Sequence, residues 1–219
     1  VATTLKHFPG HGDTNIDSHS DLPVIHHSLD RLFEVELVPF IEGIKQGADT
    51  IMTAHIYFSN LAERPHWPAT LSRNILTGLL REQLGFDGVI TTDCLEMNAI
   101  AKTVGVARGA VEAIKAGADL AMISHTYEYQ VEALDALLEI VQNGEVAFEQ
   151  IEHSVRRIGH LKDRYAGENS IKPYTGSFEY FGSPEHRQLA EKTYRESVTI
   201  VKKSHAQLNL PLKTDSKIL

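Results

Sequence analysis

A short motif recurs along the chain: glycine and aspartate stand directly before a run of apolar residues. The three copies are Gly47-Ala48-Asp49 before residues 50–54, Gly85-Phe86-Asp87-Gly88 before residues 89–92, and Gly117-Ala118-Asp119 before residues 120–123. Their aspartates are 38 and 32 positions apart, a spacing that accommodates one strand and one helix per copy. The apolar runs lack strict alternation with polar residues, as is typical of parallel strands covered on both faces. The repeat therefore predicts an α/β fold with a parallel sheet.

Helix-like segments fill the intervals between these apolar runs. Capping and glycine stop signals place them at residues 39–46, 73–84, 104–116, 128–143 and 147–165. Residues 1–6 resemble one further strand, so residues 1–165 hold four strand-to-helix units. A closed barrel of the TIM type, (β/α)8, needs eight such units and about 250 residues. Residues 1–165 are therefore predicted to form half of a (β/α)8 barrel.

The remainder of the chain predicts a boundary and a second domain. Residues 166–183 are rich in glycine and lack helical periodicity, which indicates a linker. A helix over residues 184–195 and a β-branched strand at 198–201 indicate that residues 184–219 begin a second α/β domain. Four strands leave two open sheet edges, so we expect the missing half-barrel or self-association to cover them.

The composition excludes several classes of function. The chain has 21 Lys and Arg against 29 Asp and Glu, a formal net charge of −8, which argues against nonspecific binding to nucleic acids or anionic membranes. A membrane span is not predicted, because no apolar run approaches about 18 residues. Cys94 is the single cysteine, which excludes an intrachain disulfide and a zinc site built from cysteines. We interpret Cys94 as a packing residue.

Polar side chains gather where the predicted strands end. They include His7 and His11 after the first strand, His55 after the second, Asp93 after the third and His125 after the fourth. The carboxyl ends of parallel strands meet at one rim, which holds the active site in barrels of this type. We therefore expect these side chains to surround one site.

The densest group of such residues lies in the glycine-rich loop that ends at His19. Asp17 and His19 are two positions apart, and in an extended loop that spacing points both side chains the same way. The Asp17 carboxylate is then suited to orient the His19 imidazole and stabilise its charged form for acid/base work. The alternative is that Asp17 makes an Asx-type turn while His19 faces solvent.

Asp93 ends the third apolar run, so a buried strand delivers its carboxylate onto the same rim. Such a carboxylate suits a nucleophile that attacks an anomeric carbon and forms a covalent glycosyl intermediate. A second group then protonates the departing oxygen and later activates water. The alternative is a structural role as a helix N-cap or in a rim salt bridge.

Two segments resemble motifs of glycoside hydrolase family 3, specifically its bacterial β-N-acetylglucosaminidases. The family pattern Lys-His-Phe-Pro-Gly-His-Gly, Asp-Thr, Asp-Ser-His stands intact in residues 6–19, and Thr92-Asp93-Cys94-Leu95-Glu96-Met97 resembles the nucleophile motif. The resemblance implies a retaining β-N-acetylhexosaminidase without metal or cofactor, with Asp93 as nucleophile, His19 as acid/base and Asp17 as its partner. It implies that Lys6 and His7 hold sugar hydroxyls. Further expected substrate-binding residues are His11, His55 and Met97.

The resemblance extends from residue 1 to the 160s and assigns these units to the C-terminal half of the family's catalytic barrel. It implies a terminal β-linked N-acetylglucosamine as substrate, in cell-wall muropeptides or chitooligosaccharides. The family's first-half residues, including a substrate-binding arginine and aspartate, have no counterpart, so half of the sugar pocket is expected to be missing. Residues 196–203 resemble the start of the family's second domain. No targeting segment precedes the motif, and both the bacterial cytoplasm and export to the cell wall stay open.

Two other interpretations stay open. One is an inactive fragment or interaction module that retains half of the site; as an isolated chain it should dimerise, aggregate or be poorly stable. The other is a metal-dependent barrel hydrolase. Its ligands would come from His7, His11, His19, His26, His27, His55 and Asp93.

Overall fold

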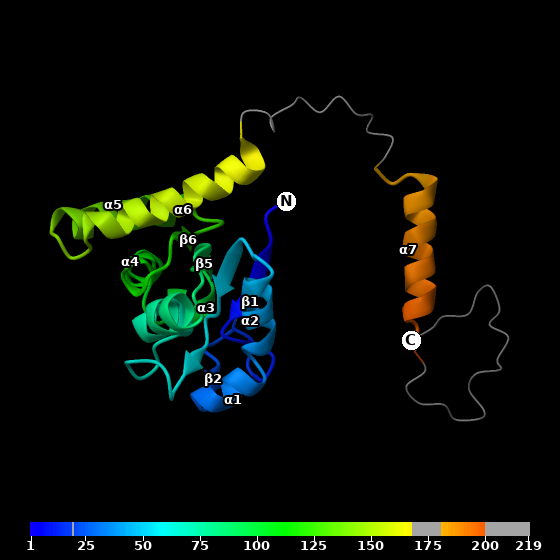
Figure 1. The fold of residues 1–219 in the computed structure, drawn as a ribbon, viewed down its shortest axis with the longest axis horizontal. Coiled ribbons are helices and arrows are strands. Elements are labelled where there is room, and N and C mark those ends of the chain that lie inside the picture. Colours follow the sequence, from blue (N-terminus) through cyan, green and yellow to red (C-terminus); the bar gives the residue numbers. More distant parts are fainter. Residues whose placement is uncertain (19, 168–180, 200–219) are drawn as a thin grey trace. The chain divides into compact units, whose positions relative to one another are not determined.

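The computed structural model describes residues 1–18, 20–167 and 181–199. The chain divides into two units, Val1–Ile171 and Lys172–Leu219, each of which is described by itself. The first unit contains a four-stranded parallel sheet with its helices (Figure 1). The described part of the second unit contains one helix.

The sheet places each strand beside the next copy of the repeat. Its strands are β1 (Thr4–Phe8), β3 (Thr50–Thr53), β5 (Val89–Cys94) and β6 (Leu120–Met122), in the order β1-β3-β5-β6. All three pairings are parallel, and Thr50 aligns with Thr4 on one side and with Val89 on the other. The predicted parallel sheet is confirmed, and its strand order is that of consecutive units of a (β/α) barrel.

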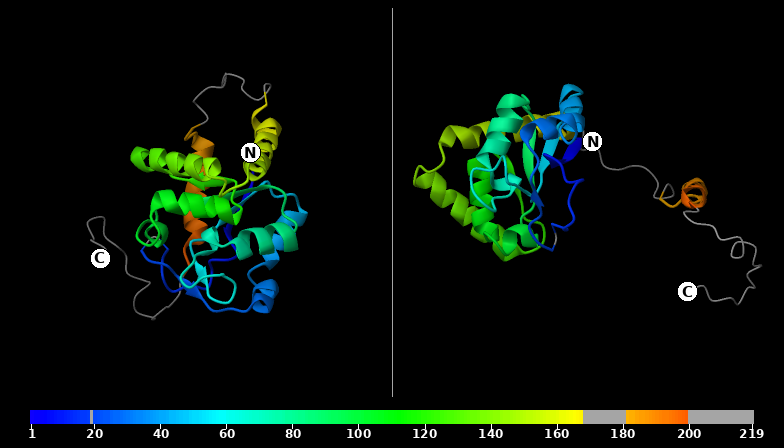
Figure 2. Two further views of the ribbon diagram at one scale, coloured as in Figure 1. Left: turned by 90° about the vertical axis from the view of Figure 1, so that its left-hand side faces the viewer. Right: turned by 90° about the horizontal axis from the view of Figure 1, so that it is seen from below.

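Helices follow the strands and cover the sheet (Figure 2). They are α2 (Val38–Lys45), η2 (Asn74–Gln83), α4 (Val106–Ala116), α5 (Tyr127–Gln142) and α6 (Phe148–Ala166). Each lies within two residues of a predicted helix, but η2 is a π-helix. Its buried positions, 75, 76, 79 and 80, have the spacing that an α-helix would also show, so the apolar pattern does not distinguish the two.

Five short elements have no counterpart among the predicted ones. They are β2 (Val24–Ile25), α1 (Leu29–Glu34), β4 (Tyr57–Phe58), the 3-10 turn η1 (Ala69–Leu71) and α3 (Asn98–Ala101). β2 and β4 pair in parallel as a separate two-stranded sheet. Segments of two to six residues are too short to display a period, so only the fold around them fixes their conformation.

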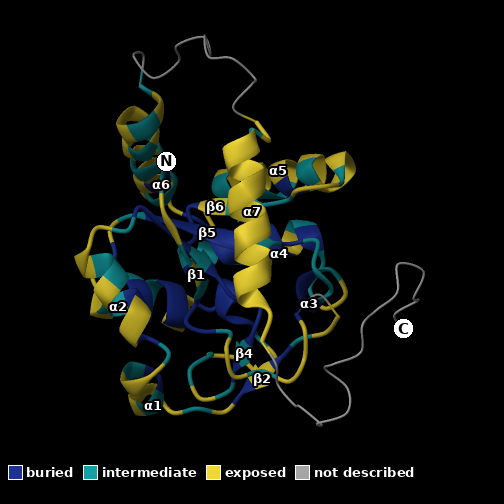
Figure 3. Cartoon of the chain, turned by 90° about the vertical axis from the view of Figure 1, so that its right-hand side faces the viewer, coloured by how far each residue is buried: buried dark blue, intermediate teal, exposed yellow. Residues whose placement is uncertain are grey.

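Side chains from the sheet and its helices form the main apolar core. In Figure 3 much of the sheet is coloured as buried. Phe8, Ile51 and Ile90 of three neighbouring strands are fully buried in it. The close approach of α4 to α3 depends on Gly109, because a Cβ atom there would lie 2.7 Å from the Cγ2 atom of Ile100. The core therefore holds the sheet rigidly below the rim where the strands end.

Aspartates of the repeat bind the neighbouring strand at the opposite end of the sheet. The Oδ2 atom of Asp49 accepts a hydrogen bond from the Thr3 amide at 2.8 Å. The Oδ2 atom of Asp119 accepts one from the Ile90 amide, also at 2.8 Å. Each of these two carboxylates thus joins the start of its own strand to the backbone of the strand before it in the sheet.

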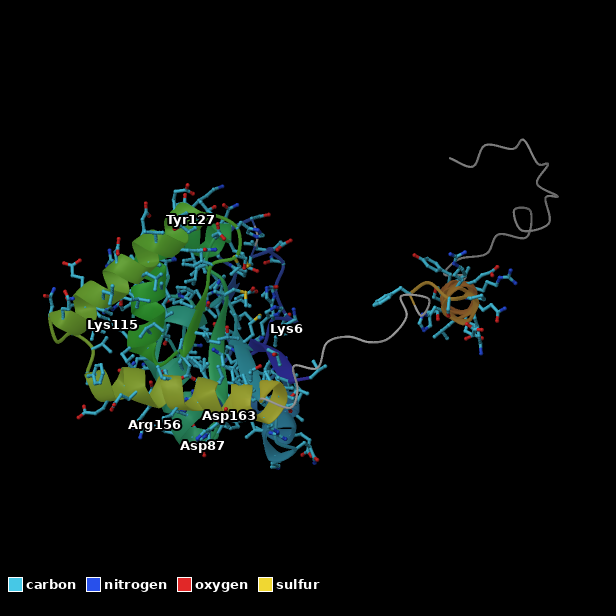
Figure 4. The ribbon with its side chains drawn as sticks, turned by 90° about the horizontal axis from the view of Figure 1, so that it is seen from above. Lys6, Asp87, Lys115, Tyr127, Arg156 and Asp163 are labelled. Carbon is cyan, nitrogen blue, oxygen red and sulfur yellow. The ribbon has the colours of Figure 1, made fainter. Side chains whose placement is uncertain are left out.

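α6 supplies cations to both carboxylates and lies along this end of the sheet (Figure 4). Arg157 Nη1 lies 3.1 Å from Asp119 Oδ1, and Arg164 Nη1 lies 2.9 Å from Asp49 Oδ1. Arg81 of η2 forms a further ion pair with Asp119. The buried carboxylates are therefore compensated by three different guanidinium groups.

The described part of the second unit is α7 (Pro184–Ser197), whose cap is Ser183 Oγ accepting from the His186 amide at 3.3 Å. This helix matches the one predicted at residues 184–195. Most of the predicted linker at 166–183 and the second half of the predicted strand at 198–201 lie outside the described residues, so both domain boundaries stay predictions. Residues 198 and 199 are described and are not in a strand. In the described part of the chain, no helix combines the length and apolar character that crossing a bilayer requires.

Candidate active site

Residues from β1 and β5 meet at the carboxyl end of the sheet, as the positions of the polar side chains predicted. His7 Nε2 lies 3.4 Å from Asp93 Oδ2, although the two residues are far apart in the chain. Both side chains are about a quarter exposed, 26% for His7 and 23% for Asp93. An imidazole beside a carboxylate at a solvent-accessible rim provides a hydrogen-bond donor and a nucleophilic oxygen at one place.

The Asp93 carboxylate is oriented by the backbone amide of the next residue, Cys94. Its Oδ1 atom accepts a hydrogen bond from the Cys94 amide at 2.7 Å, so the Oδ2 atom is the one directed toward His7. Asp93 also lines a cavity of about 300 Å³. The other residues around this cavity are Cys94, Glu96, Met97, Asn98 and His125. Met97, expected to bind substrate, therefore borders the same cavity as Asp93.

His55 lies beneath the rim rather than on it, with 1% of its surface exposed. Its Nε2 atom is 3.0 Å from the Cys94 carbonyl oxygen, and its Nδ1 atom is 2.8 Å from Thr70 Oγ1. Since a carbonyl only accepts, Nε2 carries the proton that is shared with the Cys94 carbonyl. The Thr70 hydroxyl at Nδ1 donates its own proton to the Ala54 carbonyl oxygen at 2.9 Å. Burial lowers the pKa of His55 from 6.5 to about 4, against the opposing effects of the Cys94 carbonyl and of Asp93. The neutral imidazole of His55 thus holds the carbonyl group of Cys94, the residue that follows Asp93 at the end of β5.

His11 organises the glycine-rich loop. Its Nε2 atom lies 3.1 Å from Ser18 Oγ and its Nδ1 atom 3.2 Å from Thr14 Oγ1, so both ring nitrogens contact hydroxyls of the same loop. The His11 ring packs edge-on against His7 at 5.7 Å between centroids. The loop is also anchored from outside, because Asp13 Oδ2 lies 2.8 Å from His27 Nε2.

A second cavity, of about 500 Å³, lies between this loop and helices α1 and α2. Lys6, His7 and His11 all line it, together with Asp13 and Glu36. Three of the expected substrate-binding residues therefore share one hollow beside the rim. Their contact with a sugar stays a prediction.

The predicted Asp17–His19 pair is only partly described. Asp17 is exposed, and its carbonyl oxygen accepts hydrogen bonds from the Ser20 and Asp21 amides at 2.9 and 3.1 Å. These bonds hold the backbone of Asp17 to that of residues 20 and 21. His19 itself lies outside the described residues, so its approach to Asp17 and to Asp93 stays a prediction.

Glu96 is a site residue that the sequence reasoning missed. Its carboxylate accepts hydrogen bonds from three successive amides, those of Ser124, His125 and Thr126, at 2.8, 2.7 and 2.9 Å. Bonds from the Thr126 hydroxyl and then from these amides lower the pKa of Glu96 from 4.5 to about 2. Glu96 thus fixes the loop after β6 against the loop after β5. Its place three residues after Asp93 was the available signal, but spacing alone does not reveal a backbone partner 28 positions away.

Comparisons with known proteins agree with the fold. The profile of the Glycosyl hydrolase family 3 N terminal domain matches residues 1–161. Beta-hexosaminidase A of Pseudoalteromonas piscicida is 33% identical over 239 aligned positions, which cover 100% of this chain and 38% of that protein. Beta-hexosaminidase of Xylella fastidiosa strain M23 is 41% identical over 126 positions, covering 57% of this chain and 36% of that protein.

A solved structure resembles the chain over most of its length. It is a glycoside hydrolase family 3 beta-N-acetylglucosaminidase from Paenibacillus sp. str. FPU-7, with 48% sequence identity and a TM-score of 0.85. The match covers 93% of this chain and 39% of that one. The chain therefore spans less than two-fifths of the length of each of these three relatives.

Proposed function

The chain belongs to glycosyl hydrolase family 3, and from that membership we propose that it carries the nucleophile and the acid/base of a retaining β-N-acetylhexosaminidase. The observation that carries the proposal is the Asp93 carboxylate at the end of β5, with His7 3.4 Å away and an open cavity in front of it. Names of the relatives support the sugar class, since they are hexosaminidases and a β-N-acetylglucosaminidase. Because the chain spans under two-fifths of their length, we assign it these groups and not a complete sugar pocket.

The proposed reaction is a double displacement at the anomeric carbon. The Oδ2 atom of Asp93 forms a bond to this carbon while the glycosidic C–O bond breaks, and the His19 imidazolium gives its proton to the departing oxygen. The neutral His19 then takes a proton from water. The resulting hydroxyl attacks the anomeric carbon and releases the Asp93 carboxylate, so configuration is retained. Asp17 stabilises the imidazolium form between the two steps.

We divide the remaining site residues by what their side chains touch. Lys6, His7 and Met97 border the cavities at the rim and are proposed to contact the sugar. His11 and His55 use both ring nitrogens within the protein, so we reassign them as positioning residues. His11 holds the acid/base loop, and His55 holds the backbone that follows Asp93.

The proposed substrate is a terminal β-linked N-acetylglucosamine in muropeptides or chitooligosaccharides. The test is to trap the intermediate with a slow donor that carries an electronegative substituent at C2 and a good leaving group. We expect a sugar mass on the peptide that contains Asp93, identified by mass spectrometry after digestion. Asp93→Asn should abolish the label and the turnover.

A matched control is available at the other end of the same strand. Asp87 stands just before β5, is exposed and lies at the opposite end of the sheet. Asp87→Asn should therefore label and turn over like the unmodified protein. A label on another residue, or turnover that survives Asp93→Asn, would refute the assignment of the nucleophile.

The two other interpretations are separated by direct measurements. For a metal-dependent hydrolase, a chelator should abolish turnover and zinc should restore it, whereas double displacement at Asp93 predicts that turnover persists in the presence of the chelator. For an inactive interaction module, the trapping reagent should leave no label at all. His19→Ala should impair substrates with poor leaving groups more than activated ones, because only the former need the proton.

A further inference from the structure

Three different metal-binding side chains converge where β5 and β6 end. They are those of Cys94, Glu96 and His125, whose ligand atoms all lie within 4.8 Å of one another. The Cys94 thiol already points at this centre, because its Sγ atom lies 3.7 Å from Glu96 Oε2. None of the histidines expected as ligands of a metal-dependent hydrolase belongs to this group.

The group is held in place by the backbone. The three amide hydrogen bonds that Glu96 accepts from residues 124–126 tie the loop carrying His125 to the turn carrying Cys94. Hydrogen bonds of this kind orient a carboxylate ligand and keep the ligands of a site at a fixed separation. The His125 side chain is exposed and has no hydrogen bond or ion pair with any residue that the structure describes, so its ring is free to turn toward an ion.

The donor set selects the kind of ion. Sulfur, imidazole nitrogen and carboxylate oxygen are the three ligand types of Zn²⁺, whereas Mg²⁺ and Ca²⁺ prefer oxygen alone. Three protein ligands leave a fourth tetrahedral position open, as in zinc sites that are accessible to solvent. The open position faces an existing space, since all three residues line the 300 Å³ cavity that also holds Asp93.

We propose that Cys94, Glu96 and His125 bind Zn²⁺ or a similar divalent transition-metal ion at the mouth of the Asp93 cavity. On binding, the Cys94 thiol releases its proton to solvent and the thiolate ligates the ion. An ion in this cavity obstructs the approach of a sugar to Asp93, so the site is inhibitory. The inhibitory role rests on the proposed function, whereas binding of the ion does not.

The test of binding uses Co²⁺, which occupies zinc sites and absorbs in the near ultraviolet when a thiolate ligates it. Titration of the metal-free protein should give this thiolate band with saturation at one ion per chain, and Zn²⁺ should remove it. Cys94→Ser should abolish the band. His125→Gln should weaken Co²⁺ binding at least tenfold, and because this side chain is exposed its replacement leaves the fold intact, as circular dichroism can verify.

The control is His186→Gln in α7, which replaces another exposed histidine and should leave the Co²⁺ titration unchanged. The absence of a thiolate band in the unmodified protein would overturn the site. A band that persists in Cys94→Ser, or equal affinity in His125→Gln, would overturn it as well.

The inhibitory role is measured separately, on a chromogenic N-acetylglucosaminide. Turnover should fall as Zn²⁺ is added, and the concentration for half-inhibition should rise at least tenfold in His125→Gln relative to His186→Gln. Binding without inhibition would overturn the inhibitory role and leave the metal site standing. If the slow donor leaves no label on Asp93 in the absence of zinc, the proposed function is refuted and with it the inhibitory role, while the cobalt band still decides the metal site.

Discussion

Acid should destabilise the protein through His55, whose imidazole is buried in its neutral form behind Asp93. The unfolded chain binds a proton at the ordinary pKa of 6.5, whereas burial lowers the pKa in the folded state to about 4. Between these two values the unfolded state takes up a proton that the folded state does not. Stability from this residue is therefore complete above pH 6.5 and decreases as the pH falls toward 4.

The size of the effect follows from the same two values. A difference of one pKa unit corresponds to about 1.4 kcal/mol, so the shift of His55 from 6.5 to about 4 removes roughly 3 kcal/mol by pH 4. Total stabilities of single domains are about 5–15 kcal/mol. Protonation of this one side chain would thus remove a large fraction of the stability.

The assay compares the unmodified protein with His55→Gln, which cannot titrate but retains an amide donor for the Cys94 carbonyl. Urea unfolding followed by circular dichroism at pH 7, 6, 5 and 4 gives the free energy of unfolding of each. The advantage of the unmodified protein should shrink by roughly 3 kcal/mol between pH 7 and pH 4. Carboxylates such as Asp49 and Glu96 also lose stability in acid, but they do so equally in both proteins. If the free energies of unfolding of the two proteins change equally between pH 6.5 and 4, the assignment of a buried neutral imidazole is refuted.

Other predictions concern the two ends of the sheet. Asp119→Asn should cost about 3–5 kcal/mol in urea unfolding, because it leaves buried guanidinium groups uncompensated. Arg164→Gln should cost at most about 1 kcal/mol, since that side chain is 64% exposed; equal losses would contradict this distinction. Gly117→Ala should lower stability by roughly 1–2 kcal/mol, because the residue has a φ of 112°; an unchanged melting temperature would contradict it. Glu96→Gln should accelerate hydrogen exchange of the amides at residues 124–126, and unaltered protection would show that the carboxylate does not hold that loop.

Much of the fold could be predicted because the repeat encodes it locally. Glycine stops and unbroken apolar runs are properties of short windows, and they located all four strands of the main sheet and its five longer helices, but not the short helices α1 and α3. The recurrence of Gly-Ala-Asp at Asp49 and Asp119 was visible too, but the partners of these aspartates were not. Thr3, Arg157 and Arg164 reach them from distant segments, and no local pattern records such a contact.

The sequence predicted where the candidate site lies, at the carboxyl ends of the strands, but not how its side chains are directed. Topology alone brings His7 to Asp93, because parallel strands end at one edge. The side-chain directions of His11 and His55 depend on hydroxyl partners, and the position of Thr70 below the rim follows from tertiary packing. Glu96 escaped notice for the same reason, since its partners are backbone amides, which every residue type except proline has.

The two ion pairs that α6 forms with Asp119 and Asp49 have a consequence for synthesis of the chain. Arg157 and Arg164 are seven positions apart, which is about 10 Å along a helix, and two strand spacings across the sheet are also about 10 Å. The separation of the two arginines along α6 therefore matches the separation of Asp49 and Asp119 across the sheet. While the ribosome has not yet released α6, both carboxylates lack these partners. In any shortened version that ends before residue 157, Asp49 should lack its arginine partner, while Asp119 should keep only Arg81.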